Sequence, residues 1–168
     1  MYLNHLRRLP AACAVLILAV LMTQAQAQTL TDAAGRAVDP GAARRILSLG
    51  PDVTEIIYAL GAGDRVVGVD RGSRYPDATL ARPNVGYRRQ LSAEGVLALG
   101  PDLIIASEDI GPPPVVEVLK TMAVPLLLVP EDNSLAGIEK KIALIAAALK
   151  REEEGRELAR TVRADFTA

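Results

Sequence analysis

The chain has 168 residues, of which half are hydrophobic and 23% are charged, and its formal net charge is −1 at pH 7. This composition is typical of a folded, aliphatic-rich protein and argues against intrinsic disorder. The slight acidity gives no support for nucleic-acid binding, which normally needs a basic surface.

Residues 1–27 are predicted to be a secretory signal peptide. Arg7 and Arg8 supply the positive start, residues 11–22 form an uncharged apolar run, and residues 25–27 read Ala-Gln-Ala, a typical cleavage site. The run has about a dozen residues, whereas a membrane span needs ~20, so an uncleaved membrane anchor fits less well. We therefore expect cleavage after Ala27 and export to the periplasm.

Cleavage would remove His5 and Cys13, the only histidine and the only cysteine of the sequence. Residues 28–168 would then hold 17 Lys/Arg and 20 Asp/Glu, a net charge of −3. Such a chain has no disulfide, no thiol nucleophile, no Ser-His-Asp triad and no histidine-based zinc site. Its length of about 140 residues is sufficient for one domain with its own core.

After the signal peptide, short apolar runs alternate with helical patterns. Residues 29–43 predict a short hairpin or an extended arm. The predicted strands are 45–49, 65–69, 84–87, 103–107 and 125–129. The predicted helices are 53–60, a single turn at 76–81, 92–99 and 115–122. Gly61 is expected to close the first of these helices and Ser92 to cap the third.

Residues 134–165 are predicted to form one long helix. Its apolar positions step mainly by three and four residues and are Leu135, Ile138, Ile142, Ile145, Leu149, Leu158 and Val162. A continuous helix of about 30 residues would be ~45 Å long. Gly155 is the weak point of this segment, and a break there is an alternative.

The alternation of strands and helices predicts an α/β fold with a doubly wound, mostly parallel sheet. In such sheets, ligands bind beyond the carboxyl ends of the strands. The loops expected at that rim are residues 50–52, 70–76, 107–113 and 87–91. Within them, Tyr75 and Arg74 are weaker candidates for lining a ligand cleft, as are Asp70, Arg71, Glu108 and Asp109.

Two segments resemble a known family. Residues 47–56 (LSLGPDVTEI), followed by Ala59-Leu60-Gly61, resemble the opening of cobalamin- and siderophore-type substrate-binding proteins of ABC importers. Residues 85–95 (VGYRRQLSAEG) resemble the more specific signature of the haem-binding branch, and residues 101–107 (PDLIIAS) resemble the strand that follows it. The resemblance runs from about residue 44 to the end of the chain.

This resemblance implies two α/β lobes that are bridged by one long helix, with the ligand in the cleft between them. Residues 28–133 would be the N-terminal lobe, residues 134–168 would be the bridging helix, and the second lobe would be missing. It also implies that Tyr87 ligates the haem iron, that Arg89 donates a hydrogen bond to the tyrosine oxygen, and that Glu94 docks the lobe onto the membrane permease. The family usually has methionine where this chain has Arg88.

The donor inventory agrees with this resemblance. Ferric haem takes His, Cys, Met or Tyr as its axial ligand, and residues 28–168 offer Met122, Tyr58, Tyr75 and Tyr87. Met122 and Tyr58 belong to apolar helices and suit packing. Tyr87 precedes two arginines, which favour a phenolate and can donate hydrogen bonds to it or to a haem propionate. The simpler alternative is a surface Tyr-Arg-Arg sequence without a ligand.

We therefore predict a protein that catalyses no reaction, binds haem in the periplasm and delivers it to an ABC permease, with an outer-membrane haem receptor as a further partner. One alternative is a ferric siderophore or a corrinoid on the same scaffold. Another is an exported enzyme, against which the lack of a histidine, a cysteine and a cofactor loop counts. For Glu94 the simple role is to complement the dipole of its helix.

Overall fold

The computed structural model describes residues 29–167, so the predicted signal peptide and its cleavage site lie outside the described residues. Between residues 29 and 167 we find no helix that combines the length and the apolarity of a membrane span. Near the start, β1 (Leu30–Thr31) and β2 (Ala37–Val38) form a small antiparallel hairpin. This is one of the two alternatives predicted for residues 29–43.

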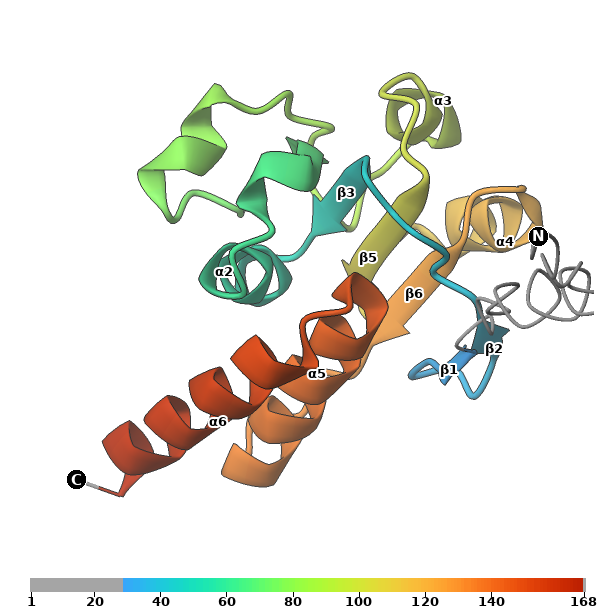
Figure 1. The fold of residues 1–168 in the computed structure, drawn as a ribbon. Helices are drawn as coiled ribbons and strands as arrows, with labels where there is room; N and C mark the ends of the chain where they lie inside the picture. Colours follow the sequence, from blue (N-terminus) through green and yellow to red (C-terminus); the bar gives the residue numbers. More distant parts are fainter. Residues whose placement is uncertain (1–28, 168) are drawn as a thin grey trace, which may run out of the picture.

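Four parallel strands form the central sheet, in the order β4-β3-β5-β6 (Figure 1). They are β3 (Ile46–Leu49), β4 (Val66–Val69), β5 (Leu103–Ser107) and β6 (Leu126–Val129). The predicted α/β fold is thereby confirmed, and each of these strands lies within one residue of its predicted bounds. The strand predicted at residues 84–87 is wrong: it amounts to a single bridge between Val69 and Asn84, because Gly86, with φ of 93°, turns the chain away.

The predicted helix at residues 134–165 is also wrong, because the chain folds into two helices. Helix α5 (Leu135–Leu149) ends at Lys150, and α6 (Glu152–Phe166) returns beside it in the opposite direction (Figure 1). The chain does not break at Gly155, where the two helices instead pack closely. A Cβ atom at this position would lie 2.5 Å from the Cβ of Ala146. Helical periodicity continues across the turn because each helix has its own apolar side.

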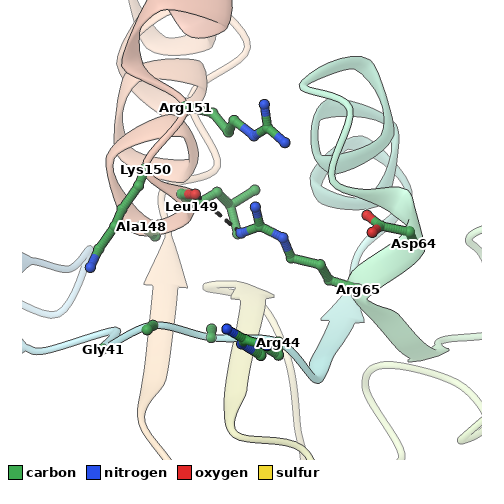
Figure 2. Close-up of a pocket in the computed structure, with 10 residues that line it drawn as sticks. Gly41, Arg44, Asp64, Arg65, Ala148, Leu149, Lys150 and Arg151 are labelled. Carbon is green, nitrogen blue, oxygen red and sulfur yellow. Dashed lines mark hydrogen bonds between the residues drawn. The ribbon is translucent and has the colours of Figure 1, made fainter.

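Lys150 makes the turn between these helices, with a left-handed backbone (φ 57°, ψ 48°). The turn borders a cavity of about 530 Å³ that Arg44, Asp64 and Arg65 also line (Figure 2). A guanidinium nitrogen of Arg65 donates to the carbonyl oxygen of Leu149 at 3.2 Å. Since Arg44 and Arg65 precede β3 and β4, this cavity lies at the amino ends of the strands.

Lys150→Gly is expected to stabilise the protein by about 1 kcal/mol, because a left-handed backbone strains a residue that has a Cβ atom but not glycine. The gain is reduced by the larger conformational freedom of glycine in the unfolded chain. Urea unfolding would measure the difference, with Lys150→Ala as the control that keeps the Cβ atom. A glycine variant no more stable than the alanine variant would contradict this expectation.

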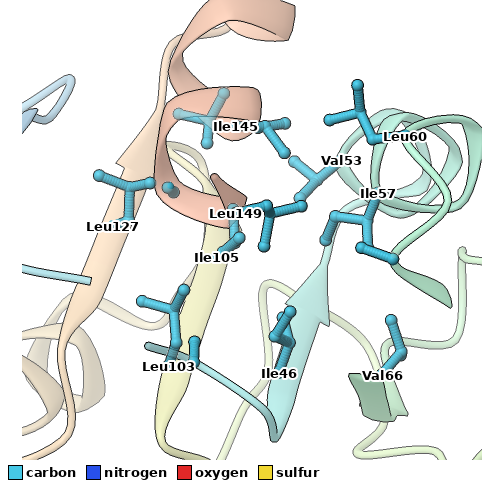
Figure 3. Close-up of a cluster of buried hydrophobic side chains, with 14 of the residues drawn as sticks. Ile46, Val53, Ile57, Leu60, Val66, Leu103, Ile105, Leu127, Ile145 and Leu149 are labelled. Carbon is cyan, nitrogen blue, oxygen red and sulfur yellow. The ribbon is translucent and has the colours of Figure 1, made fainter. Parts of the chain in front are cut away.

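Helices cover both faces of the sheet, which explains why its strands are continuous apolar runs. Helices α2 (Pro51–Ala59) and α5 pack on one face, against Ile46, Ile105 and Leu127 (Figure 3). Helices α3 (Ala93–Leu97) and α4 (Pro113–Thr121) pack on the other face, against the side chains that alternate with these. Residues 63–65 and 77–81 form two short 3-10 helices. Because both faces are covered, the ends of the strands remain for ligand binding.

Candidate functional site

The predicted rim lies at the carboxyl ends of the strands. After β3 the chain crosses to the face of α2, and after β5 it crosses to the face of α4. These two loops leave neighbouring strands toward opposite faces, and in open α/β sheets ligands bind at such a point, beyond the carboxyl ends of the strands. The structure therefore places the candidate site beside the ends of β3, β4 and β5.

Asp70, directly after β4, is the polar centre of this rim and is fully buried. Its Oδ1 accepts from the backbone nitrogen of Gly50 at 3.0 Å and from the hydroxyl of Ser73 at 2.6 Å, and its Oδ2 accepts from the nitrogen of Gly72 at 2.9 Å. The hydroxyl of Thr54 lies 2.8 Å from that of Ser73. Asp70 therefore holds the loops after β3 and β4 together and is not a side chain that lines the cleft.

Tyr87 lies in a loop that is fastened on both sides. On one side the backbone nitrogen of Arg71 donates to the carbonyl of Gly86 at 2.7 Å. On the other side the nitrogen of Gly111 donates to the carbonyl of Arg88 at 2.9 Å. The loop is thereby held between the loops that follow β4 and β5, while the Tyr87 side chain is 38% exposed. This arrangement presents the phenol at the rim on a fixed backbone.

Asp109, in the loop after β5, binds both arginines that follow Tyr87. The Nε and Nη2 atoms of Arg88 donate to Oδ1 and Oδ2 of Asp109, each at 2.9 Å. Arg89 donates from Nε to Oδ2 at 3.0 Å and also from Nη2 to the same oxygen. The remaining Nη1 of Arg89 lies 3.5 Å from the Tyr87 hydroxyl oxygen, to which it donates. The structure thus brings together three of the predicted site residues around one carboxylate.

These contacts shift the acidity of the groups involved. Hydrogen bonds from Arg88, and next from Arg89, outweigh partial burial and lower the pKa of Asp109 from 3.8 to about 2. Hydrogen bonding to Asp109 raises the pKa of Arg88 and of Arg89 further above the usual value for arginine. The cluster is therefore ionised near neutral pH. One carboxylate stands against two guanidiniums, which leaves one net positive charge beside the phenol of Tyr87.

Comparison with known proteins shows the family of the chain. The sequence profile of the periplasmic binding protein family matches residues 46–168. The chain belongs to this family. As a periplasmic binding protein it lies in the periplasm, as predicted, and the family consists of substrate-binding proteins that work with ABC transporter permeases. A relative from Bacillus subtilis (strain 168), 33% identical over 73% of this chain and 40% of the relative, is described as an uncharacterized ABC transporter substrate-binding lipoprotein.

Individual relatives differ in what they bind. The periplasmic haem-binding protein RhuT from Roseiflexus sp. RS-1 is 44% identical, with a TM-score of 0.71 over 74% of this chain and 48% of that chain. The periplasmic vitamin B12-binding protein BtuF of Vibrio cholerae is 32% identical, with a TM-score of 0.67 over 75% of this chain and 49% of that chain. A vitamin B12-binding protein of Yersinia pestis (strain Pestoides F) is 34% identical over 118 residues, 70% of this chain and 37% of the relative. The chain spans half or less of the length of these relatives.

The other predicted site residues of this periplasmic binding protein lie apart from the arginine cluster. Arg74 and Tyr75 are exposed on the loop after β4, with Tyr75 67% exposed. Glu94 is exposed in the first turn of α3, where the side chain of Ser92 caps the helix by accepting from the nitrogen of Gly95 at 3.1 Å. The predicted cap is confirmed, and the carboxylate of Glu94 faces solvent.

A second polar cluster at the rim was missed from the sequence. Asp52 is in the first turn of α2, but Gly50 holds the N-cap position, without a side-chain bond. Asp52 instead forms an ion pair with Lys141 of α5, which is 3% exposed. Lys141 also lies 3.9 Å from a carboxylate oxygen of Glu131, which accepts from the hydroxyl of Ser107. In the sequence Lys141 is typical of a solvated helix position, so no feature of the sequence predicts that it is buried.

Among residues 29–167 no group of three or more His, Cys, Asp or Glu side chains could hold a bare metal ion. At the rim, the phenol oxygen of Tyr87 is a single donor with Arg89 beside it. One such donor suits a metal that arrives with its other ligands already bound.

The acid stability of the protein should depend on Asp109. The pKa of this carboxylate is lowered by folding, so its stabilising contribution is present above about pH 4 and is lost as the pH falls through about 2. We expect the free energy of unfolding to fall more steeply over this range for the wild type than for Asp109→Asn. Urea unfolding at several pH values would measure both slopes. The control is Asp64→Asn, at the amino ends of the strands, which should keep the wild-type slope. Equal slopes for all three proteins would contradict the contribution of Asp109 to acid stability.

Proposed function

We propose that this chain carries the haem-binding residues of a periplasmic binding protein that delivers haem to an ABC permease, with Tyr87 as the ligand of the ferric iron. The observation that carries the proposal is the rim cluster, in which the Tyr87 hydroxyl stands 3.5 Å from a guanidinium nitrogen of Arg89. A phenolate is a hard anionic donor that suits ferric haem. A guanidinium that donates to the oxygen favours its charged form.

The other donors fit the role less well. The hydroxyl of Tyr58 accepts from Nε of Arg82 at 3.3 Å beside the 3-10 helix at residues 63–65, away from the loop after β5. Met122 is at the C-terminal end of α4 and borders a hollow with residues of β2. Tyr75 is on the rim but is not held by a neighbouring cation as Tyr87 is. Tyr87 therefore combines location, exposure and a charged partner.

The arginines in the loop after β4 and next to Tyr87 favour haem over a corrinoid. Arg71 and Arg74 are exposed on the loop after β4. Arg88 and Arg89 together with the carboxylate of Asp109 have a net charge of +1. Haem presents two carboxylates as propionates, whereas the side chains of a corrinoid ring end mostly in neutral amides. The similarity to a haem-binding protein at 44% identity supports the same choice. The alternative of a corrinoid is supported by the similarity to two vitamin B12-binding proteins.

Delivery would use the parts of the chain around the rim. The exposed Glu94 is proposed to dock onto basic residues of the permease. Helix α6 runs in the same direction as the strands (Figure 1), so we propose α6, and not the whole of residues 134–168, as the start of the helix that bridges two lobes. An outer-membrane haem receptor is the proposed upstream source of haem.

Absorption spectroscopy of the full chain titrated with hemin, and separately with cyanocobalamin, tests the proposal. We expect hemin to give the spectrum of a high-spin ferric haem bound by a tyrosinate, and cyanocobalamin to compete poorly. Tight binding of cyanocobalamin with no change in the hemin spectrum would support the corrinoid alternative and contradict haem delivery.

A further inference from the structure

We propose that Asp109 is a positioning residue of the haem site, which holds Arg88 as a structural anchor and aims Arg89 at the iron-binding oxygen. This inference rests on the proposed function, because it concerns how the same site is assembled. It gives Arg88 a structural role, whereas the sequence analysis left either arginine as a possible partner of a haem propionate.

The two guanidiniums are bound in different ways. Arg88 uses Nε and Nη2 on the two oxygens of Asp109, and its side chain is 19% exposed. This two-pronged pairing matches the planar fork of arginine to a carboxylate and is the strong geometry for such a pair. The donors of Arg88 that could reach a propionate are thereby largely engaged. Arg88 consequently anchors the Tyr87 loop to the loop after β5.

Arg89 is bound by Asp109 but keeps one guanidinium nitrogen for the Tyr87 hydroxyl. Its Nε and Nη2 both meet Oδ2 of Asp109, its Nη1 points to the Tyr87 hydroxyl, and its side chain is 53% exposed. A free arginine side chain samples many rotamers, and ordering it has an entropic cost. Asp109 fixes the guanidinium before any ligand arrives, so that cost is met within the folded protein.

The backbone brings Asp109 to this place. The nitrogen of Leu91 donates to the carbonyl of Gly111 at 2.9 Å, next to the bond from Gly111 to Arg88. These two bonds align the segment after Tyr87 with the segment after Asp109. Without the carboxylate, two like charges would face each other on adjacent residues and would repel. Asp109 is therefore required for both arginines to occupy one side of the loop.

The test compares Asp109→Asn with two other variants. Asp64→Asn is the matched change at the amino ends of the strands, and Arg88→Met removes the anchoring arginine. Each variant of the full chain is loaded with hemin, its ferric-tyrosinate band is recorded, and its hemin release to a haem scavenger is timed. We expect Asp109→Asn to shift the band and to release hemin about tenfold faster, the size expected for losing one charge-assisted interaction. Arg88→Met should have a smaller effect, because Asp109 still holds Arg89, and Asp64→Asn should match the wild type.

A readout without ligand separates positioning from general damage. The Nε–H signals of Arg88 and Arg89 in NMR spectra should be protected from exchange in the wild type and in Asp64→Asn, and should lose that protection in Asp109→Asn. Should Asp109→Asn fail to fold, Asp109→Glu replaces it, since moving the carboxylate by one methylene should also shift the band and speed release.

Two results would overturn the inference, and they differ in what they say of the proposed function. If the wild type binds hemin through a tyrosinate and the Asp109 variants match it in band and release rate, the positioning role is wrong and haem binding stands. If the wild type gives no tyrosinate spectrum with hemin, both are wrong.

Discussion

Replacing Tyr87 with phenylalanine will remove the ferric-tyrosinate absorption and weaken hemin binding by about a hundredfold or more. The substitution keeps the ring and removes the oxygen, so the contacts of the loop survive while the iron loses its donor. Loss of a partner group around a metal typically weakens affinity by about 10–100-fold, and loss of the ligand itself should exceed that range. Hemin titration followed by absorption spectroscopy measures both the band and the affinity.

Tyr75→Phe is the matched control for this prediction. Tyr75 is an exposed tyrosine on a neighbouring loop of the same rim, and removing its hydroxyl should leave the tyrosinate band in place. A hemin complex of Tyr87→Phe that keeps the band, or a Tyr75→Phe variant that loses it, would transfer the ligand role from Tyr87 to Tyr75.

Replacing Asp70 with alanine will lower the free energy of unfolding by about 3 kcal/mol. The change removes three hydrogen bonds and leaves the buried nitrogen of Gly50 without its acceptor. Leaving a buried donor unsatisfied costs about 1–3 kcal/mol, which makes this a large effect for a single substitution. Equilibrium unfolding in urea, monitored by circular dichroism, gives the value.

Asp77→Ala provides the comparison, because Asp77 is an exposed acidic residue a few positions further along the same loop. Its removal should change the stability by less than about 0.5 kcal/mol, as is usual for surface substitutions. An Asp70→Ala variant as stable as Asp77→Ala would show that water replaces the lost carboxylate, and it would contradict the role of Asp70 in holding the rim loops.

Patterns local in sequence predicted most of the elements of the fold correctly. The buried strands were predicted because their apolar runs are short and are bounded by turn residues, as in the case of residues 103–107. Ser92 was predicted as a cap because its hydroxyl acts within three residues. The error at residues 134–165 has a physical cause: two amphipathic helices that pack on each other continue one periodicity, and a single left-handed residue, Lys150, separates them.

The candidate site divides in the same way. Tyr87, Arg88 and Arg89 are neighbours in sequence, so their type and order pointed to an anionic oxygen with cationic support. The partner that organises them, Asp109, is about 20 residues away and stood among several equally weak rim candidates. The burial of Asp70 and of Lys141 was likewise invisible, since it depends on which loops and helices cover them.

The sequence by itself thus determined the α/β class and the bounds of the main strands, and it predicted the rim as the place of binding and the tyrosine with its two arginines. These features depend on residue type and on contacts within a few positions of the chain. Only the tertiary structure decided that Asp109 joins both arginines, that Asp70 supports the rim and that α6 turns back along α5. Each of these depends on side chains that the fold of the sheet brings together from distant positions, where no periodicity or spacing records the contact.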